Sequence, residues 1–213
     1  MKGLRRFIGL CVTMGSTLLG SLVFTQPVSA ATDKYTVLPG DSLWKISLTY
    51  HVGWPEIYNS NRGLIKDPAL IYPGQVLQIP LVSSTVTNYE QQVLVLCNQI
   101  RAKNGLPSLT MNWQLERMGR IKAQEMASKN YFSHTSPVYG TPFQMMKSFG
   151  ISYTYAGENI AAGQPTPQEV VTSWMNSPGH KANILSKNYT QIGVGYASGG
   201  PYGTYWTQEF IRP

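Results

Sequence analysis

The stretch from Trp174 to Leu185 constrains the fold of this chain more than any other. Its sequence, WMNSPGHKANIL, is typical of a helix that ends, a sharp turn, and a second helix that begins at once. Ser177 is a preferred residue for capping that second helix, and Pro178 suits its first turn, where a backbone N–H has no partner. The pattern therefore predicts His180 at a helix N-terminus, with one face open toward the rest of the domain.

Two further polar residues are candidates for the same site. His134 lies in YFSHTSP, and Glu158 lies in GENI between a flexible glycine and the turn-forming Asn159. The chain has only three histidines, and two of them are in such turn-rich settings. We expect His134, Glu158 and His180, each on its own turn, to converge in one hollow that solvent reaches.

The first thirty residues have the pattern of a secretory signal peptide. Lys2, Arg5 and Arg6 precede an apolar run from Phe7 to Phe24, and Val28-Ser29-Ala30 has the small-x-small form of a cleavage site. We predict a signal peptide over residues 1–30 and export without stable membrane insertion. An uncleaved anchor is the alternative.

The net charge and the cysteine content of the chain limit what it is expected to bind and what chemistry it is expected to carry out. Cleavage removes three basic residues and lowers the net charge from +7 to +4, which suits an anionic surface such as a cell wall. The basic residues are scattered and form no run interleaved with aromatics, so we predict no nucleic-acid binding. Cys97 stays alone in an apolar helical stretch and is predicted to be a buried thiol, not a nucleophile.

Residues 34–80 predict a small βααβ module, with strands near 35–38 and 75–80 and two short helices between them. The motifs YTV, PGDSLWKI and IYPGQVLQIP make this stretch similar to the LysM module. The resemblance implies binding of glycans rich in N-acetylglucosamine, chiefly peptidoglycan or chitin, in a groove between two loops. In this chain the corresponding residues are Gly40, Asp41, Ser42, Leu43, Ile71, Tyr72, Pro73 and Gly74.

Residues 81–89 lack periodicity and are rich in hydroxyl side chains, which indicates a flexible linker. Residues 90–213 then place helical patterns first and two alternating strands, near 192–196 and 205–211, last. This order predicts an α+β fold with helices on the faces of a sheet.

The second domain resembles the bacterial CAP, or SCP-like, superfamily along its whole length. The resemblance rests on FSH, GENIA, SPGHKANIL, GVG and WTQ. It implies an α-β-α sandwich with a cleft that holds two histidines and acidic residues. His134, Glu158 and His180 match three of four such positions, whereas Ser177 stands where secreted eukaryotic members have a second glutamate. The resemblance allows Zn²⁺ or another divalent cation on these three residues.

Three interpretations of this cluster remain open: an acid/base or metal-assisted hydrolytic site, a ligand or cation site without turnover, and a structural cluster. Ser133 and Ser136 are near His134, but we expect them to brace the turn before Pro137. Strand alternation is compatible with a solvated side chain at Glu209. We predict a bacterial protein, secreted and associated with the cell wall or the spore surface, whose enzymatic activity is left open.

Overall fold

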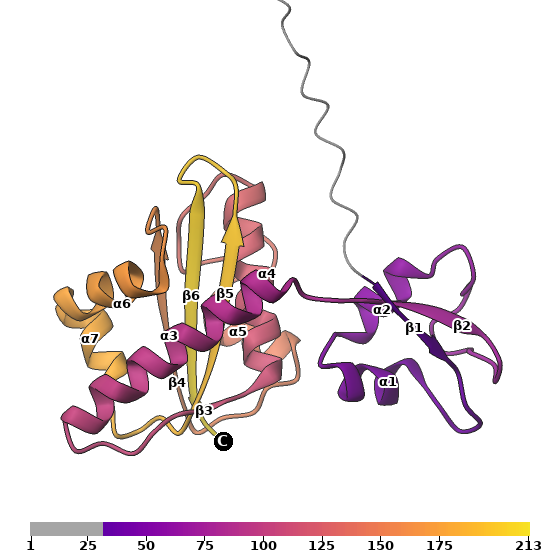
Figure 1. Ribbon diagram of the computed structural model, residues 1–213, viewed down its shortest axis with the longest axis horizontal. Helices are drawn as coiled ribbons and strands as arrows, with labels where there is room; N and C mark the ends of the chain where they lie inside the picture. The colour runs from indigo at the N-terminus through magenta and orange to yellow at the C-terminus, as the bar shows by residue number, and fades with distance from the viewer. Residues whose placement is uncertain (1–31) are drawn as a thin grey trace, which may run out of the picture.

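The computed structural model describes residues 32–213, which form two domains joined by a short connection (Figure 1). The predicted signal peptide lies outside these residues. Within the described part, no helix is long and apolar enough to cross a membrane.

The N-terminal module has the predicted βααβ order. Strands β1 (Thr32–Thr36) and β2 (Val76–Pro80) pair antiparallel, and helices α1 (Leu43–Tyr50) and α2 (Trp54–Ser60) connect them. The small core between sheet and helices is Val37, Leu43, Ile46, Val52, Ile57, Ile65, Leu77 and Ile79. Ser42 caps α1 by accepting a hydrogen bond from the Lys45 amide.

The connection between the domains is shorter and more ordered than we predicted. The linker prediction for residues 81–89 was wrong from residue 84 onward, because α3 spans Ser84–Lys103. The Ser83 hydroxyl accepts from the Val86 amide and starts this helix. Most side chains of the first two turns are exposed and only Val86 and Tyr89 are half-buried, so the apolar periodicity is weak there. Full burial begins at Glu90 and Val93.

The C-terminal domain is an α-β-α sandwich, which confirms the α+β prediction. Its sheet has the order β3-β5-β6-β4, with β3 parallel to β5 and the other neighbours antiparallel. The remaining elements of the domain are β3 (Thr110–Met111), α4 (Trp113–Ser128), α5 (Pro142–Ser148), β4 (Tyr155–Ala162), α6 (Pro167–Asn176), α7 (Pro178–Ile184), β5 (Gln191–Ser198) and β6 (Thr204–Arg212).

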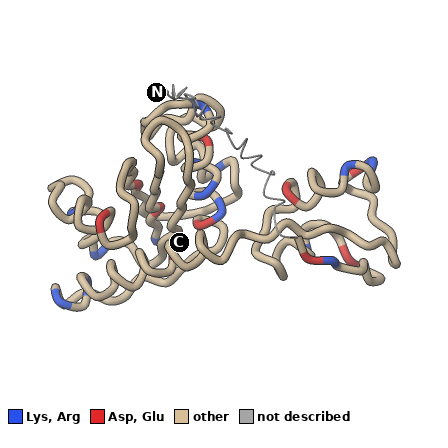
Figure 2. The backbone as a smooth tube through the Cα atoms, turned by 45° about the horizontal axis from the view of Figure 1, so that its top comes forward, with Lys and Arg blue, Asp and Glu red and all other residues tan. Residues whose placement is uncertain are grey.

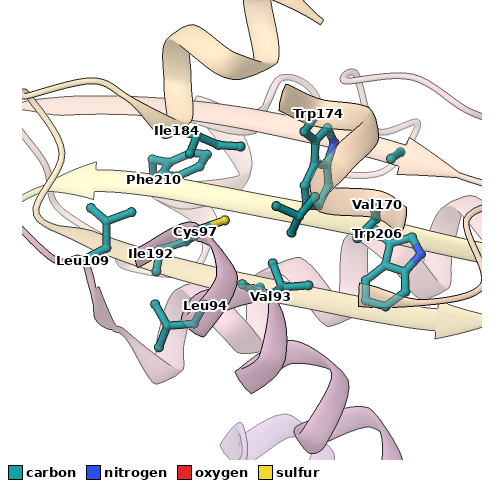
Figure 3. Close-up of a cluster of buried hydrophobic side chains, with 13 residues drawn as sticks. Val93, Leu94, Cys97, Leu109, Val170, Trp174, Ile184, Ile192, Trp206 and Phe210 are labelled. Atoms are coloured by element: carbon teal, nitrogen blue, oxygen red, sulfur yellow. The ribbon is translucent and has the colours of Figure 1, made fainter. Parts of the chain in front are cut away.

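Helices cover both faces of this sheet. On one face, α3, α6 and α7 pack against β5 and β6, and Cys97 lies fully buried in that core, as predicted (Figure 3). Burial raises the pKa of its thiol to about 12, which removes it as a nucleophile. On the other face, α4 and α5 contribute Leu115, Met118, Met145 and Met146, which pack on Ile211 of β6. Side chains on either face of β6 are therefore removed from water.

Direct contacts, rather than the connection alone, set the arrangement of the two domains. Arg117 of α4 forms a two-pronged ion pair with Glu56 of α2, with N···O distances of 3.0 and 2.9 Å. The His51 ring stacks on Trp113 at 5.5 Å between centroids. Lys, Arg, Asp and Glu are spread over both domains (Figure 2).

The close packing of strand β5 on helix α4 can be tested by substituting glycines. A Cβ on Gly195 of β5 would overlap the backbone of Gly119 and Arg120 in α4, whereas a Cβ on Gly179 of α7 would meet nothing within 4 Å. Gly195→Ala should destabilise the protein by about 1–3 kcal/mol through overpacking. Gly179→Ala should leave the free energy of unfolding within about 1 kcal/mol of wild type. Urea unfolding of both variants compares them, and equal stabilities would contradict the close packing of α4 on β5.

Candidate functional site

Glu158 lies on a strand, which corrects the expectation that it sits on a turn. Strand β4 spans Tyr155–Ala162 at one edge of the sheet, although it contains Gly157 and Asn159, residues that strands disfavour. Tertiary contacts explain both. A Cβ at Gly157 would collide with the Tyr189 hydroxyl. The buried Asn159 amide donates to Gln208 Oε1 at 3.0 Å and to the His180 carbonyl at 3.1 Å.

The outer edge of β4 is covered by side chains from the α6–α7 region and the loop after it. Alternate β4 carbonyls point away from β6, and each accepts one side-chain donor. The three bonds are Trp174 Nε1 to the Ile160 oxygen at 3.3 Å, Asn183 Nδ2 to the Glu158 oxygen at 3.2 Å, and the Tyr189 hydroxyl to the Ala156 oxygen at 3.2 Å. These bonds protect an edge strand and fix the SPGHKANIL segment beside it.

His180 is held at this edge through its own backbone, because its carbonyl accepts from Asn159. Ser177 occupies the N-cap position of α7 as predicted, but its hydroxyl makes no capping bond. Burial lowers the pKa of His180, and the neighbouring His134 lowers it further. The His180 imidazole is therefore neutral at pH 7.

His134 is oriented by Glu158. The two side chains meet at 2.6 Å between His134 Nδ1 and Glu158 Oε1; the imidazole is 53% exposed and the carboxylate 2% exposed. When Glu158 is ionised, its oxygen can only accept, so His134 Nδ1 donates in this contact and Nε2 is left for other partners.

A second buried carboxylate lies next to Glu158. Glu209 of β6 is directly opposite Glu158 in the antiparallel register and is completely buried. The expectation of a solvated Glu209 is wrong, because α4 covers this face of the sheet. Burial raises the pKa of Glu209, and the charge of Glu158 raises it further. Within the described residues neither Glu209 oxygen nor Glu158 Oε2 has a hydrogen-bond partner, and a proton on Glu209 would supply the missing donor.

A buried network supports the loop that carries His134. Lys122 of α4 is 1% exposed, and its ammonium donates to the His134 carbonyl at 2.9 Å. Burial lowers the pKa of Lys122. Glu125, one turn along, accepts from the Tyr131 hydroxyl at 2.7 Å and from the Ser136 hydroxyl at 2.6 Å. Ser136 thus braces the turn, as expected, and is not placed as a nucleophile.

Sequence reasoning missed Lys122 and Glu125 as parts of the site. A signal was present, because both lie among apolar residues at helical spacing: Met118, Lys122, Ala123, Glu125 and Met126 are all buried positions of α4. A charged residue on the buried face of a helix needs a partner inside the protein, and here that partner is the His134 loop.

The cleft itself wraps around the end of the β4 edge. His134 approaches from the loop after α4, and His180 approaches from α7 on the opposite face of the sheet. The cleft has a volume of about 480 Å³ and is lined by Phe132, Ser133, His134, Ile160, Ala161, Ala162, Gln164, Ser173, Trp174, Ser177 and His180. Glu158 is not among the lining residues, so it acts on the cleft only through His134.

This geometry does not fit a divalent cation held by His134, His180 and Glu158. One Glu158 oxygen is bonded to His134, and the other is buried beside Glu209. Across residues 32–213, no three His, Cys, Asp or Glu side chains are grouped so that they could hold a metal ion. Two imidazoles alone fall short of the three protein ligands that are usual for a catalytic zinc.

The predicted glycan residues of the N-terminal module fall into three groups. Ser42 and Leu43 line a hollow of about 290 Å³ with Trp44, Trp54, Pro68 and Ala69, although the Leu43 side chain is mostly core. The Asp41 carboxylate is already engaged within the module, because it accepts hydrogen bonds from the Tyr35 hydroxyl and the Leu38 amide. Gly40, Ile71, Tyr72, Pro73 and Gly74 do not line the hollow.

The two predicted loops are nevertheless tied together at their bases. Gly40 and Gly74 both have positive φ, at 85° and 89°. The Gly74 amide donates to the Val37 carbonyl, and the Val37 amide donates to the Gln75 carbonyl. Tyr72 stands exposed at the tip of its loop. The predicted site did not include Trp44 and Trp54, which are both exposed.

The burial of Glu209 beside Glu158 predicts how the stability of the protein depends on pH. A glutamate whose pKa is raised in the folded state stabilises the protein below pH 4.5, and this contribution is lost as the pH rises toward the folded value. Glu209→Gln mimics the protonated form and removes this loss. Its stability relative to wild type should therefore increase between pH 5 and pH 8, by on the order of 1 kcal/mol.

Urea unfolding at several pH values measures this difference. The control is Glu169→Gln at an exposed position of α6, for which the difference from wild type should not change with pH. A pH-independent difference for Glu209→Gln as well would contradict a shared proton between Glu158 and Glu209.

Comparison with known proteins agrees with this architecture. Residues 94–210 match the CAP family, the Cysteine-rich secretory protein family, and residues 35–80 match the LysM domain. YkwD of Bacillus subtilis is 56% identical over 128 residues, which cover 60% of this chain and 49% of YkwD. The resuscitation-promoting factor Rpf of Micrococcus luteus is 46% identical over 46 residues, 21% of each chain. This chain spans about half or less of the length of these relatives.

Among solved structures, an extracellular SCP-domain protein of Bacillus anthracis aligns with a TM-score of 0.56 and 32% identity, over 66% of this chain and 47% of that one. An outer surface protein of Borrelia burgdorferi aligns with a TM-score of 0.53 and 23% identity, over 57% and 90% of the two chains, and shares the fold. The chain thus belongs to the CAP family and carries a LysM domain ahead of its CAP domain.

Proposed function

We propose that this is an exported, wall-associated protein whose LysM domain binds peptidoglycan and whose CAP cleft binds a ligand through His134 and His180. The observation that carries the second half is that both imidazoles line one cleft at the β4 edge, although they come from opposite faces of the sheet. The predicted signal peptide and the modestly basic composition support export to an anionic wall or spore surface.

The LysM hollow suits a sugar chain. Trp44 and Trp54 are 51% and 40% exposed and offer ring faces for pyranose rings and acetamido methyl groups. One small module makes few such contacts, so retention on a polymer with many repeats is the expected mode.

The CAP cleft offers polar groups over an apolar floor. His134 and His180 line it, and the exposed Phe132 provides apolar surface. The Ile160 carbonyl points away from β6, so its amide does too and adds a main-chain donor at the strand edge. Gln164 Oε1 is buried without a hydrogen-bond partner among the described residues. A ligand with amide or acetamide groups, as in wall polymers and their peptides, matches these donors and acceptors.

The first experiment tests the LysM half. Wild-type protein should co-sediment with purified peptidoglycan, and deletion of residues 34–80 should abolish this. Ala69 is exposed in the wall of the LysM hollow, so Ala69→Trp should fill it and lower the bound fraction severalfold. His134→Ala is the matched variant in the other domain and should bind as wild type does. Undiminished binding by the deletion variant would overturn the assignment.

The hydrolase alternative rests on the 2.6 Å contact between His134 and Glu158. In that case His134 Nε2 would take a proton from an attacking water, and Glu158 would stabilise the imidazolium. The binding proposal predicts that muropeptide profiles of digested walls are the same with and without the protein. A profile that changes with wild type, but not with His134→Ala or Glu158→Gln of unchanged melting temperature, would establish the hydrolase instead.

The zinc content of the purified protein distinguishes a cleft that binds a cation from one that does not. Because Glu158 is turned away from the cleft, protein purified without a histidine tag should hold well under one equivalent of zinc. Elemental analysis of wild type and of His134→Ala and His180→Ala measures it. A full equivalent that both substitutions remove would contradict this and establish a cation site.

A further inference from the structure

A second hollow lies where the two domains meet. Its volume is about 390 Å³, which is within the range of ligand sites. The LysM side contributes residues of α1 and α2, and the CAP side contributes residues of α4 and of the segment around the end of α5. The lining residues used below are Trp44, Trp54, Asn59, Gln114, Ser148 and Phe149.

This hollow shares part of its lining with the LysM hollow. Trp44 and Trp54 line both, and each is the exposed aromatic residue of the first turn of its helix. A sugar chain that lies across both Trp rings would therefore extend from the LysM hollow into the space between the domains.

The wall formed by the CAP domain is fixed in place. Arg117 lies over the Phe149 ring at 4.7 Å and pairs with Glu56 across the interface. Trp113 stacks on His51. Because these contacts already hold the domains together, a ligand would find the hollow formed before it binds, and little ordering entropy would oppose binding.

The chemistry of the lining favours a neutral sugar chain. The Trp54 ring and the amide side chains of Asn59 and Gln114 line the hollow, and both amides can donate to hydroxyl and acetamido groups. Arg117 and Glu56 neutralise each other, so the hollow presents no uncompensated charge to the carboxylates of an acidic stem peptide.

We propose that this inter-domain hollow is a second subsite for the glycan strand held by the LysM domain, so that the CAP domain takes part in glycan binding outside its histidine cleft. The inference rests on the proposed LysM function. It predicts that affinity depends on the length of the glycan beyond what the LysM groove alone can contact.

Calorimetric titration of the full chain with N-acetylglucosamine oligomers of four and eight units tests this. For wild type the octamer should bind about tenfold more tightly than the tetramer. Gln114→Trp and Ser148→Trp each fill the hollow from the CAP side. Both should bind the tetramer as wild type does but lose most of the gain with the octamer. Their melting temperatures check that they fold.

Gln99→Trp is the matched control, because Gln99 is exposed and lines a different hollow, between α3 and α6. It should retain the full gain. A longer oligomer can bind a single groove in more than one register, which by itself raises the apparent affinity. The gain in affinity that remains in Gln114→Trp and Ser148→Trp measures this contribution.

The outcomes separate the two proposals. If no oligomer binds at all, the LysM assignment fails. If the tetramer binds and all variants show the same gain, the second subsite is overturned while LysM binding stands. A gain that appears only with fragments carrying stem peptides would also overturn the glycan assignment, in favour of a peptide site.

Discussion

Burial of the carboxylate pair at the β4–β6 register is the interaction on which the candidate site depends. Because α4 covers this face of the sheet, Glu158 and Glu209 are removed from water together, and two adjacent buried carboxylates disfavour double ionisation. A proton on Glu209 would let Glu158 remain an acceptor for His134. The orientation of the exposed His134 imidazole is therefore determined by two carboxylates, Glu158 and Glu209, that solvent does not reach.

The segments that carry the two histidines are fixed by different means. The His134 loop is held from within by the Lys122 ammonium and the Glu125 carboxylate. The α7 helix is held from outside by amide and indole donors that bond the free edge of β4. The α6–α7 motif is thus an edge-protecting element as well as a source of His180, which explains why a polar segment packs tightly against a strand.

The two domains contact each other directly and are not independent units. The Arg117–Glu56 pair and the His51–Trp113 stack set their relative placement, and this placement creates a hollow that neither domain has alone. With the functions proposed above, such an arrangement would combine retention on the polymer with a fixed presentation of the histidine cleft.

The sequence by itself determined the βααβ order of the LysM module, the two C-terminal strands, the LysM and CAP families, the buried Cys97, and the candidate residues His134, Glu158 and His180. These follow from local periodicity, capping residues and motifs, which act over a few positions of the chain. Only the tertiary structure decided that Glu158 lies on an edge strand, that Glu209 is buried, that Lys122 supports the His134 loop, and that Trp44 and Trp54 line two hollows. Each of these depends on which distant segment contacts a residue. The periodicity of α4 indicates that Lys122 lies on a buried face, but it does not identify the partner, because that partner comes from another part of the chain.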